Sequence, residues 1–165
     1  MNKYILNFYS QTQSIDPQYL PKVPPPQSRI AKKADLAILI GPTPAMTEWQ
    51  RHNPSIGLSH MENGYTRQKP VVCPIGVKYN GGDYREAVCQ LGLWSAAALE
   101  KLKCLASLKG GDTHAMDVLD GFPYPSLTVV GYEWKLHVSW KEKVTGKVVS
   151  GVSLPCDVSV CANLW

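Results

Sequence analysis

The strongest periodic signal in the chain is a strand, a turn and a long helix between Val71 and Leu105, with the sequence VVCPIGVKYNGGDYREAVCQLGLWSAAALEKLKCL. The apolar run before Lys78 is typical of a buried strand, and Asn80-Gly81-Gly82 is a strong turn signal. Asp83 follows as a helix N-cap. Apolar residues then recur at steps of three and four, which predicts a helix over about residues 83–105 with one face against a sheet: Ala87, Leu91, Trp94, Ala98, Leu102 and Leu105.

Further strands are predicted on both sides of this unit. Leu36–Ile40 is a continuous apolar run that ends at Gly41-Pro42 and has Asp35 at its start. An acid at this place marks either a solvated strand end or the edge of a cleft. After the helix, β-branched and aromatic runs predict a C-terminal β-meander at residues 126–130, 134–140 and 147–154. In the middle run polar and apolar residues alternate, so we expect His137 to point to solvent.

The segment of residues 76–99, GVKYNGGDYREAVCQLGLWSAAAL, resembles the core of the PD-(D/E)XK nuclease-like proteins common in fungi. In that family a Glu-x-Lys strand and a glycine turn precede a helix with Gln-Leu-Gly-x-Trp, so Lys78 matches the motif lysine and Gln90 the helix glutamine. The resemblance implies an α/β, restriction-endonuclease-like fold with a mixed central sheet, and a fungal origin. The motif glutamate, however, is Gly76 in this chain. The resemblance therefore implies a degenerate member that lacks half of its metal site.

The same resemblance suggests which other residues lie in the cleft. The strand after Asp35 is the one that carries the family's first metal-binding acid, and His60 is in register with a family histidine. Glu86 precedes Gln90 by four residues, so both lie on one helical face. Glu86 therefore either lends a carboxylate to the cleft or closes a capping box with Asp83, and we favour the capping box.

Length and composition indicate one folded domain. The 165 residues divide into an extended, Pro-rich N-terminal arm at 1–29 and a nuclease-like domain at 30–165, with a long loop predicted at 41–70. The net charge of +4 comes from dispersed lysines, which permits a nucleic acid partner without requiring one. The five cysteines form no Cys-x-x-Cys pair, and we expect an intracellular protein, cytoplasmic or nuclear, with no membrane partner. The arm is a candidate contact for a homo-oligomer.

These observations leave three functions open, of which we favour the first. In the first, the cleft no longer cleaves nucleic acid and performs acid–base chemistry on a small organic ligand, as in an isomerase, cyclase or lyase, without a cofactor. The catalytic residues would be Lys78, Asp35, Gln90 and His60, and the ligand would contact Glu86, Trp94 and Tyr79. The second function is nucleic acid binding without cleavage, or a purely interacting role. The third is a residual Mg²⁺-dependent nuclease, with Asp35 and Glu86 as the metal ligands.

Overall fold

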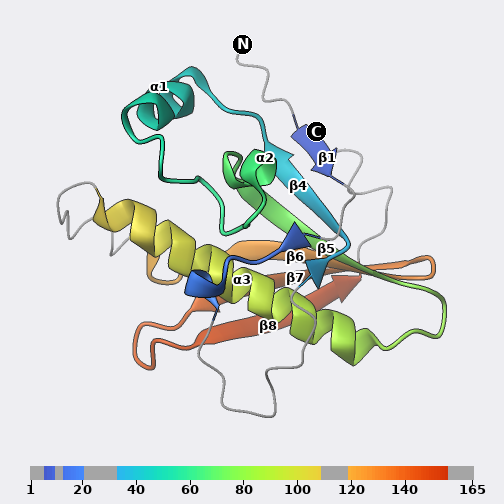
Figure 1. Cartoon of the computed structure of the whole chain (residues 1–165). Coiled ribbons are helices and arrows are strands. Elements are labelled where there is room, and N and C mark those ends of the chain that lie inside the picture. Colours follow the sequence, from blue (N-terminus) through green and yellow to red (C-terminus); the bar gives the residue numbers. More distant parts are fainter. Residues whose placement is uncertain (1–5, 10–12, 21–32, 109–118, 156–165) are drawn as a thin grey trace.

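The computed structural model describes residues 6–9, 13–20, 33–108 and 119–155 and shows a mixed sheet with one long helix across it (Figure 1). The six strands are ordered β1-β4-β5-β6-β7-β8, and a separate two-stranded ribbon pairs β2 with β3. The elements are β1 (Leu6–Tyr9), β2 (Gln13–Ser14), η1 (Pro17–Tyr19), β3 (Lys33–Ala34), β4 (Leu36–Ile40), α1 (Pro44–His52), α2 (Gly64–Arg67), β5 (Val71–Lys78), α3 (Tyr84–Ser107), β6 (Tyr124–Val130), β7 (Glu133–Lys141) and β8 (Val148–Pro155).

Helix α3 is the crossover between two parallel strands. β5 and β6 are parallel, whereas every other neighbouring pair in the six-stranded sheet is antiparallel. A parallel pair needs such a connection, because the chain must return to the end of the sheet at which the first strand began before the second strand can run in the same direction. The N-terminus of α3 consequently lies at the end of the sheet where β5 and β6 finish and β7 begins. The predicted α/β fold, with its long helix and C-terminal meander, is confirmed.

The two faces of the sheet hold separate apolar clusters. On the α3 side, Ala37 and Leu39 of β4 pack with Trp94, which has no exposed surface. On the opposite side, Ile75 and Val129 form a second buried cluster. Burial of a large aromatic side chain contributes on the order of 2 kcal/mol relative to leaving it in water. Trp94 therefore anchors α3 on the sheet.

The predicted orientation of His137 is wrong. Its side chain lies on the α3 side of the sheet, is only 6% exposed, and has Nε2 3.0 Å from Oγ1 of Thr128. Burial, and then the charge of Lys135, lower the pKa of His137. Alternation along β7 identifies two faces but not which of them a helix covers, and here α3 covers the more polar one.

The region between β4 and β5 is more regular than the sequence suggested. Where we predicted a loop, α1 begins at the N-cap Thr43 with Pro44 as its first residue, and the short α2 follows the N-cap Asn63. Part of the predicted arm joins the structure as β1, β2 and η1, while its prolines at 21 and 24–26 lie outside the described residues. Among the helices of the described residues, none is long and apolar enough to cross a membrane.

Candidate functional site

Lys78 is the last residue of β5 and points toward α3. Gly81, with φ of +86°, allows the chain to turn directly after the strand and start the helix. The Nζ of Lys78 lies 3.0 Å from Oε2 of Glu86 in the first turn of α3, and the lysine side chain is 18% exposed. The ammonium group is thus held beside the first turn of α3, at the end of β5, and is not extended into solvent.

The carboxylate of Glu86 belongs to this group, which overturns the capping box that we favoured. Asp83 is the N-cap, and its Oδ1 accepts the N–H groups of Arg85 and Glu86 at 2.8 and 3.2 Å. Glu86 does not complete the box: Oε2 is bound by Lys78, and Oε1 accepts from Nε2 of Gln90 at 3.2 Å. Glu86 therefore faces Lys78 at the end of β5.

Asp35 approaches the same strand from the other side. Leu36 pairs with Ile75, which places Asp35 next to the last residues of β5. Its Oδ2 accepts the backbone N–H of Val77 at 2.8 Å. Asp35 and Glu86 thus bind successive residues of β5, the first from the β4 side and the second from the helix. Of the sequence-predicted site residues, Asp35, Lys78, Glu86 and Gln90 come together.

The glycine in place of the motif glutamate is not required by the backbone. Gly76 is absent from the glycines with positive φ, and a Cβ built on it would meet Ala87 and Leu91 at 3.6–3.7 Å, which is ordinary contact. That Cβ would point toward α3, as the side chain of Lys78 does two residues later. The strand could therefore carry a side chain at this position.

The other predicted residues lie elsewhere. His60 is buried against Trp94, with ring centroids 5.0 Å apart, and no described residue bonds its Nε2. Burial, with a smaller contribution from Lys101, lowers the pKa of His60 to about 3, so the ring is neutral at physiological pH. Trp94 is a core residue, whereas Tyr79 is 79% exposed on the turn after β5. The described contacts of His60 do not reach Lys78 or Glu86.

A second polar group lies beside this site. Thr128 pairs with Gly76 across β5 and β6, and its hydroxyl meets His137. The ring of Tyr84 at the start of α3 is 6.1 Å from that of His137 and 4.5 Å from Nζ of Lys135. Sequence reasoning missed this group because it depends on strand register, which is not a local signal.

A cavity of about 690 Å³ is found away from these residues. It lies between η1, α3 and the β7–β8 connection, and apolar side chains such as Leu93, Leu99 and Val148 contribute to its walls. Its charged residues include Glu100 and Lys141, which form an ion pair at 3.6 Å. None of the converging residues lines this cavity, so we place the candidate site at the end of β5 instead.

Two carboxylates at the end of β5 are the described residues that could hold a magnesium-type ion bound mainly through water. The described part of the chain has no group of three or more His, Cys, Asp or Glu residues that could hold a metal. Mg²⁺ needs fewer protein ligands, because it keeps several waters and takes one or two carboxylates. Asp35 and Glu86 supply two, and the hydrogen bonds from Val77 and Gln90 orient them.

Comparison with known proteins identifies a family for the chain. A family model described as the PD-(D/E)XK nuclease superfamily matches residues 2–156, which is nearly the whole chain. The match includes β1 and extends across the sheet to β8. Neither the curated proteins nor the solved structures gave a match.

Proposed function

Because the chain belongs to the PD-(D/E)XK nuclease superfamily, we propose that it is a metal-dependent nuclease whose second carboxylate comes from Glu86 on α3 instead of from the position of Gly76. The observation that supports this most directly is the 3.0 Å contact between Glu86 and Lys78. A glutamate two residues before Lys78 would share a strand face with it. Glu86 brings a carboxylate to the same ammonium from the helix that covers that face.

Each residue has a distinct role in this proposal. Lys78 binds a phosphate oxygen and stabilises the negative charge that develops during cleavage. Asp35 and Glu86 are the carboxylate ligands, and Gln90 holds Glu86 through its amide. A divalent ion, when bound, supplies neutralisation of phosphate charge and activation of water. Glu86 would exchange its ion pair with Lys78 for the metal ion, and the ammonium of Lys78 would then be available to the phosphate.

The experiment is a cleavage assay on plasmid DNA and oligonucleotides with Mg²⁺ and Mn²⁺. We expect Lys78→Ala and Glu86→Gln to lower the rate about 100-fold or more, as loss of a charge-stabilising group does in other enzymes. Glu100→Gln is the matched control. Glu100 lies on the same helix, pairs with a lysine, and its side chain is 50% exposed against 49% for Glu86. Equal rates in the Glu86 and Glu100 variants of an active wild type would contradict the role of Glu86.

A rescue variant tests the relocation itself. Gly76→Glu, made in the Glu86→Gln background, returns a carboxylate to the motif position, and the strand has room for the added Cβ. We expect cleavage to recover in this double variant. Failure to recover, with the protein folded, would mean that a carboxylate at position 76 does not replace Glu86.

The second candidate function is metal-independent acid–base chemistry on a small organic ligand. The paired Lys78 and Glu86 favour it, because they form a proton donor and acceptor that need no metal. This candidate predicts no cleavage with either ion, and small ligands that raise the melting temperature of wild type but not of Lys78→Ala. Cleavage that depends on Glu86 would rule it out as the main activity.

A further inference from the structure

Two neighbouring turns at the end of the molecule with the candidate site each carry an exposed tyrosine. Tyr79 follows β5, and Tyr132 lies in the turn between β6 and β7. The turns are joined, because Gly131 N–H donates to the carbonyl of Lys78 at 3.1 Å and a Cβ built on Gly131 would lie 3.2 Å from Cβ of Asn80. The two tyrosines are thus the residues next to this contact, one on each turn.

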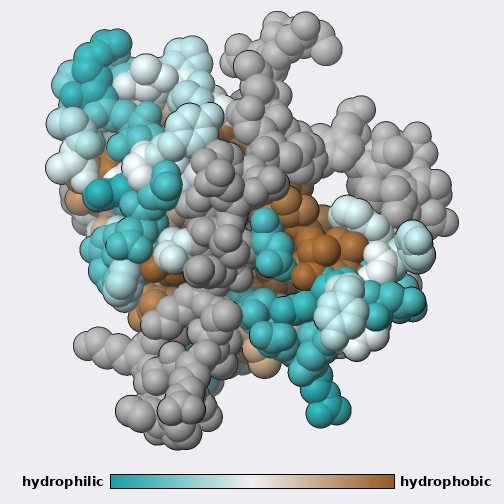
Figure 2. Space-filling model, turned by 45° about the vertical axis from the view of Figure 1, so that its right-hand side comes forward, coloured by the Kyte–Doolittle hydropathy of each residue, from teal (hydrophilic) through white to brown (hydrophobic). Residues whose placement is uncertain are grey.

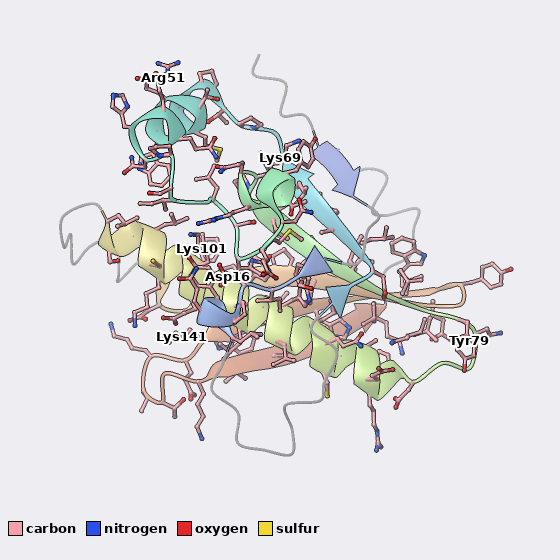
Figure 3. The ribbon with its side chains drawn as sticks, in the orientation of Figure 1. Asp16, Arg51, Lys69, Tyr79, Lys101 and Lys141 are labelled. Atoms are coloured by element: carbon pink, nitrogen blue, oxygen red, sulfur yellow. The ribbon has the colours of Figure 1, made fainter. Side chains whose placement is uncertain are left out.

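Both rings project into solvent. Tyr132 is 96% exposed and Tyr79 is 79% exposed. Figure 3 places Tyr79 on the β5–α3 connection, at the right-hand end of the molecule. Figure 2 turns that end forward, where hydrophilic and near-neutral side chains lie next to a hydrophobic area. A single exposed aromatic ring is ordinary, but two rings on adjoining turns beside a candidate site form a surface suited to planar partners.

The charges nearby are balanced rather than basic. Arg85 and Lys135 contribute cations at this end, whereas Asp83 and Glu133 contribute anions, and Glu133 lies 3.6 Å from Lys135. A protein that binds a nucleic acid duplex through the phosphate backbone neutralises many phosphates with clustered cations. Among the described side chains of this surface, few cations lack an anionic neighbour and two rings are exposed, so contact with bases is favoured over contact with many phosphates. Bases are open to stacking only where they are unpaired.

We propose that this end of the molecule binds single-stranded nucleic acid. Unpaired bases stack on Tyr79 and Tyr132, and this places the phosphate backbone of the nucleic acid beside Lys78. The inference rests on the proposed nuclease function, and it adds the class of substrate. Tyrosine suits this use, because a stacked ring tolerates every base. The binding has a weak salt dependence, since the backbone meets few cations.

The test measures binding in the absence of metal, so that it does not depend on cleavage. Fluorescence anisotropy follows a labelled oligothymidylate of about 16 nucleotides, the upper range of one single-strand site. We expect Tyr79→Ala and Tyr132→Ala each to weaken Kd about fivefold or more, and the phenylalanine variants to keep wild-type affinity. Tyr65→Ala is the control, because Tyr65 is 55% exposed but lies on α2. The matching duplex should bind more weakly than the single strand.

The outcomes separate this inference from the proposed function. Unchanged affinity in both alanine variants, or equal affinity for duplex and single strand, overturns the inference even if the protein cleaves DNA through Glu86. Tyrosine-dependent binding supports it, and does so even if cleavage fails, in which case the proposed function alone is lost. A loss of binding in the phenylalanine variants overturns the stacking role, since the ring is retained there.

Discussion

His60 should make the protein sensitive to acid. Its side chain is 2% exposed and packs against Trp94, and burial lowers its pKa from 6.5 to about 3. In the unfolded chain the same ring accepts a proton below about pH 6.5. Between these two values the unfolded state binds more protons, so the free energy of unfolding falls as the pH decreases. The contribution of the neutral, buried His60 to the free energy of unfolding is thus fully present above about pH 6.5 and is lost as the pH falls toward about 3.

The size of the effect follows from the same shift. One pH unit corresponds to about 1.36 kcal/mol, so at about pH 5 the folded state has lost about 2 kcal/mol through His60. We would measure urea unfolding by tryptophan fluorescence at about pH 7.5 and about pH 5, in wild type and in His60→Leu. Between about pH 7.5 and about pH 5, the free energy of unfolding should fall by about 2 kcal/mol less in His60→Leu than in wild type. The difference isolates His60, because His137, whose pKa is also lowered, is present in both proteins.

His52→Leu is the control for this experiment. The side chain of His52 lies on α1 and is 70% exposed, so this variant removes a histidine without changing the buried ring of His60. If wild type and His60→Leu lose the same stability on acidification, the buried neutral state of His60 is refuted.

Three further predictions concern stability. Asp83→Ala should lower the free energy of unfolding by about 1 kcal/mol, measured in urea, because two N–H groups of α3 lose their acceptor; no change would contradict the cap. Tyr19→Phe should cost about 1–3 kcal/mol, because Lys101 is 3% exposed and its Nζ donates to the Tyr19 hydroxyl at 2.9 Å. Adding Lys101→Met should make the Tyr19 change nearly neutral, and additive losses in this double-mutant cycle would contradict the coupling. Gly131→Ala should cost about 1–2 kcal/mol, since φ is +59°, whereas Gly76→Ala should leave the melting temperature nearly unchanged; equal effects would contradict the backbone geometry.

The elements predicted well from sequence are those with continuous local signals. Leu36–Ile40 has the bounds of β4, and the spacing from Ala87 onward gave α3 to within two residues. The short helices were missed because nine and four residues carry little periodicity, although Thr43-Pro44 is a recognisable helix start. Local patterns also do not say which face of β7 lies under α3, and for this reason His137 was misplaced.

Four of the seven residues predicted for the candidate site lie together at the end of β5, but their contacts with one another were not predicted. Asp35, Lys78 and Gln90 could be identified from the motif that surrounds them. The spacing from Asp83 to Glu86 favoured a capping box, and only the position of Lys78 shows that Glu86 turns toward the lysine. The position of Thr128 beside Gly76 depends on the register of β6, which no local pattern reveals.

The most direct measurement of the central claim is a calorimetric titration of Mn²⁺ and Mg²⁺ into wild type, Glu86→Gln and Glu100→Gln. The account predicts about one ion bound per chain in wild type and in the Glu100 variant. Affinity in the Glu86 variant should fall about 10-fold or more. Absence of binding in wild type, or the same affinity in all three proteins, would contradict the claim that Glu86 supplies the carboxylate that Gly76 lacks.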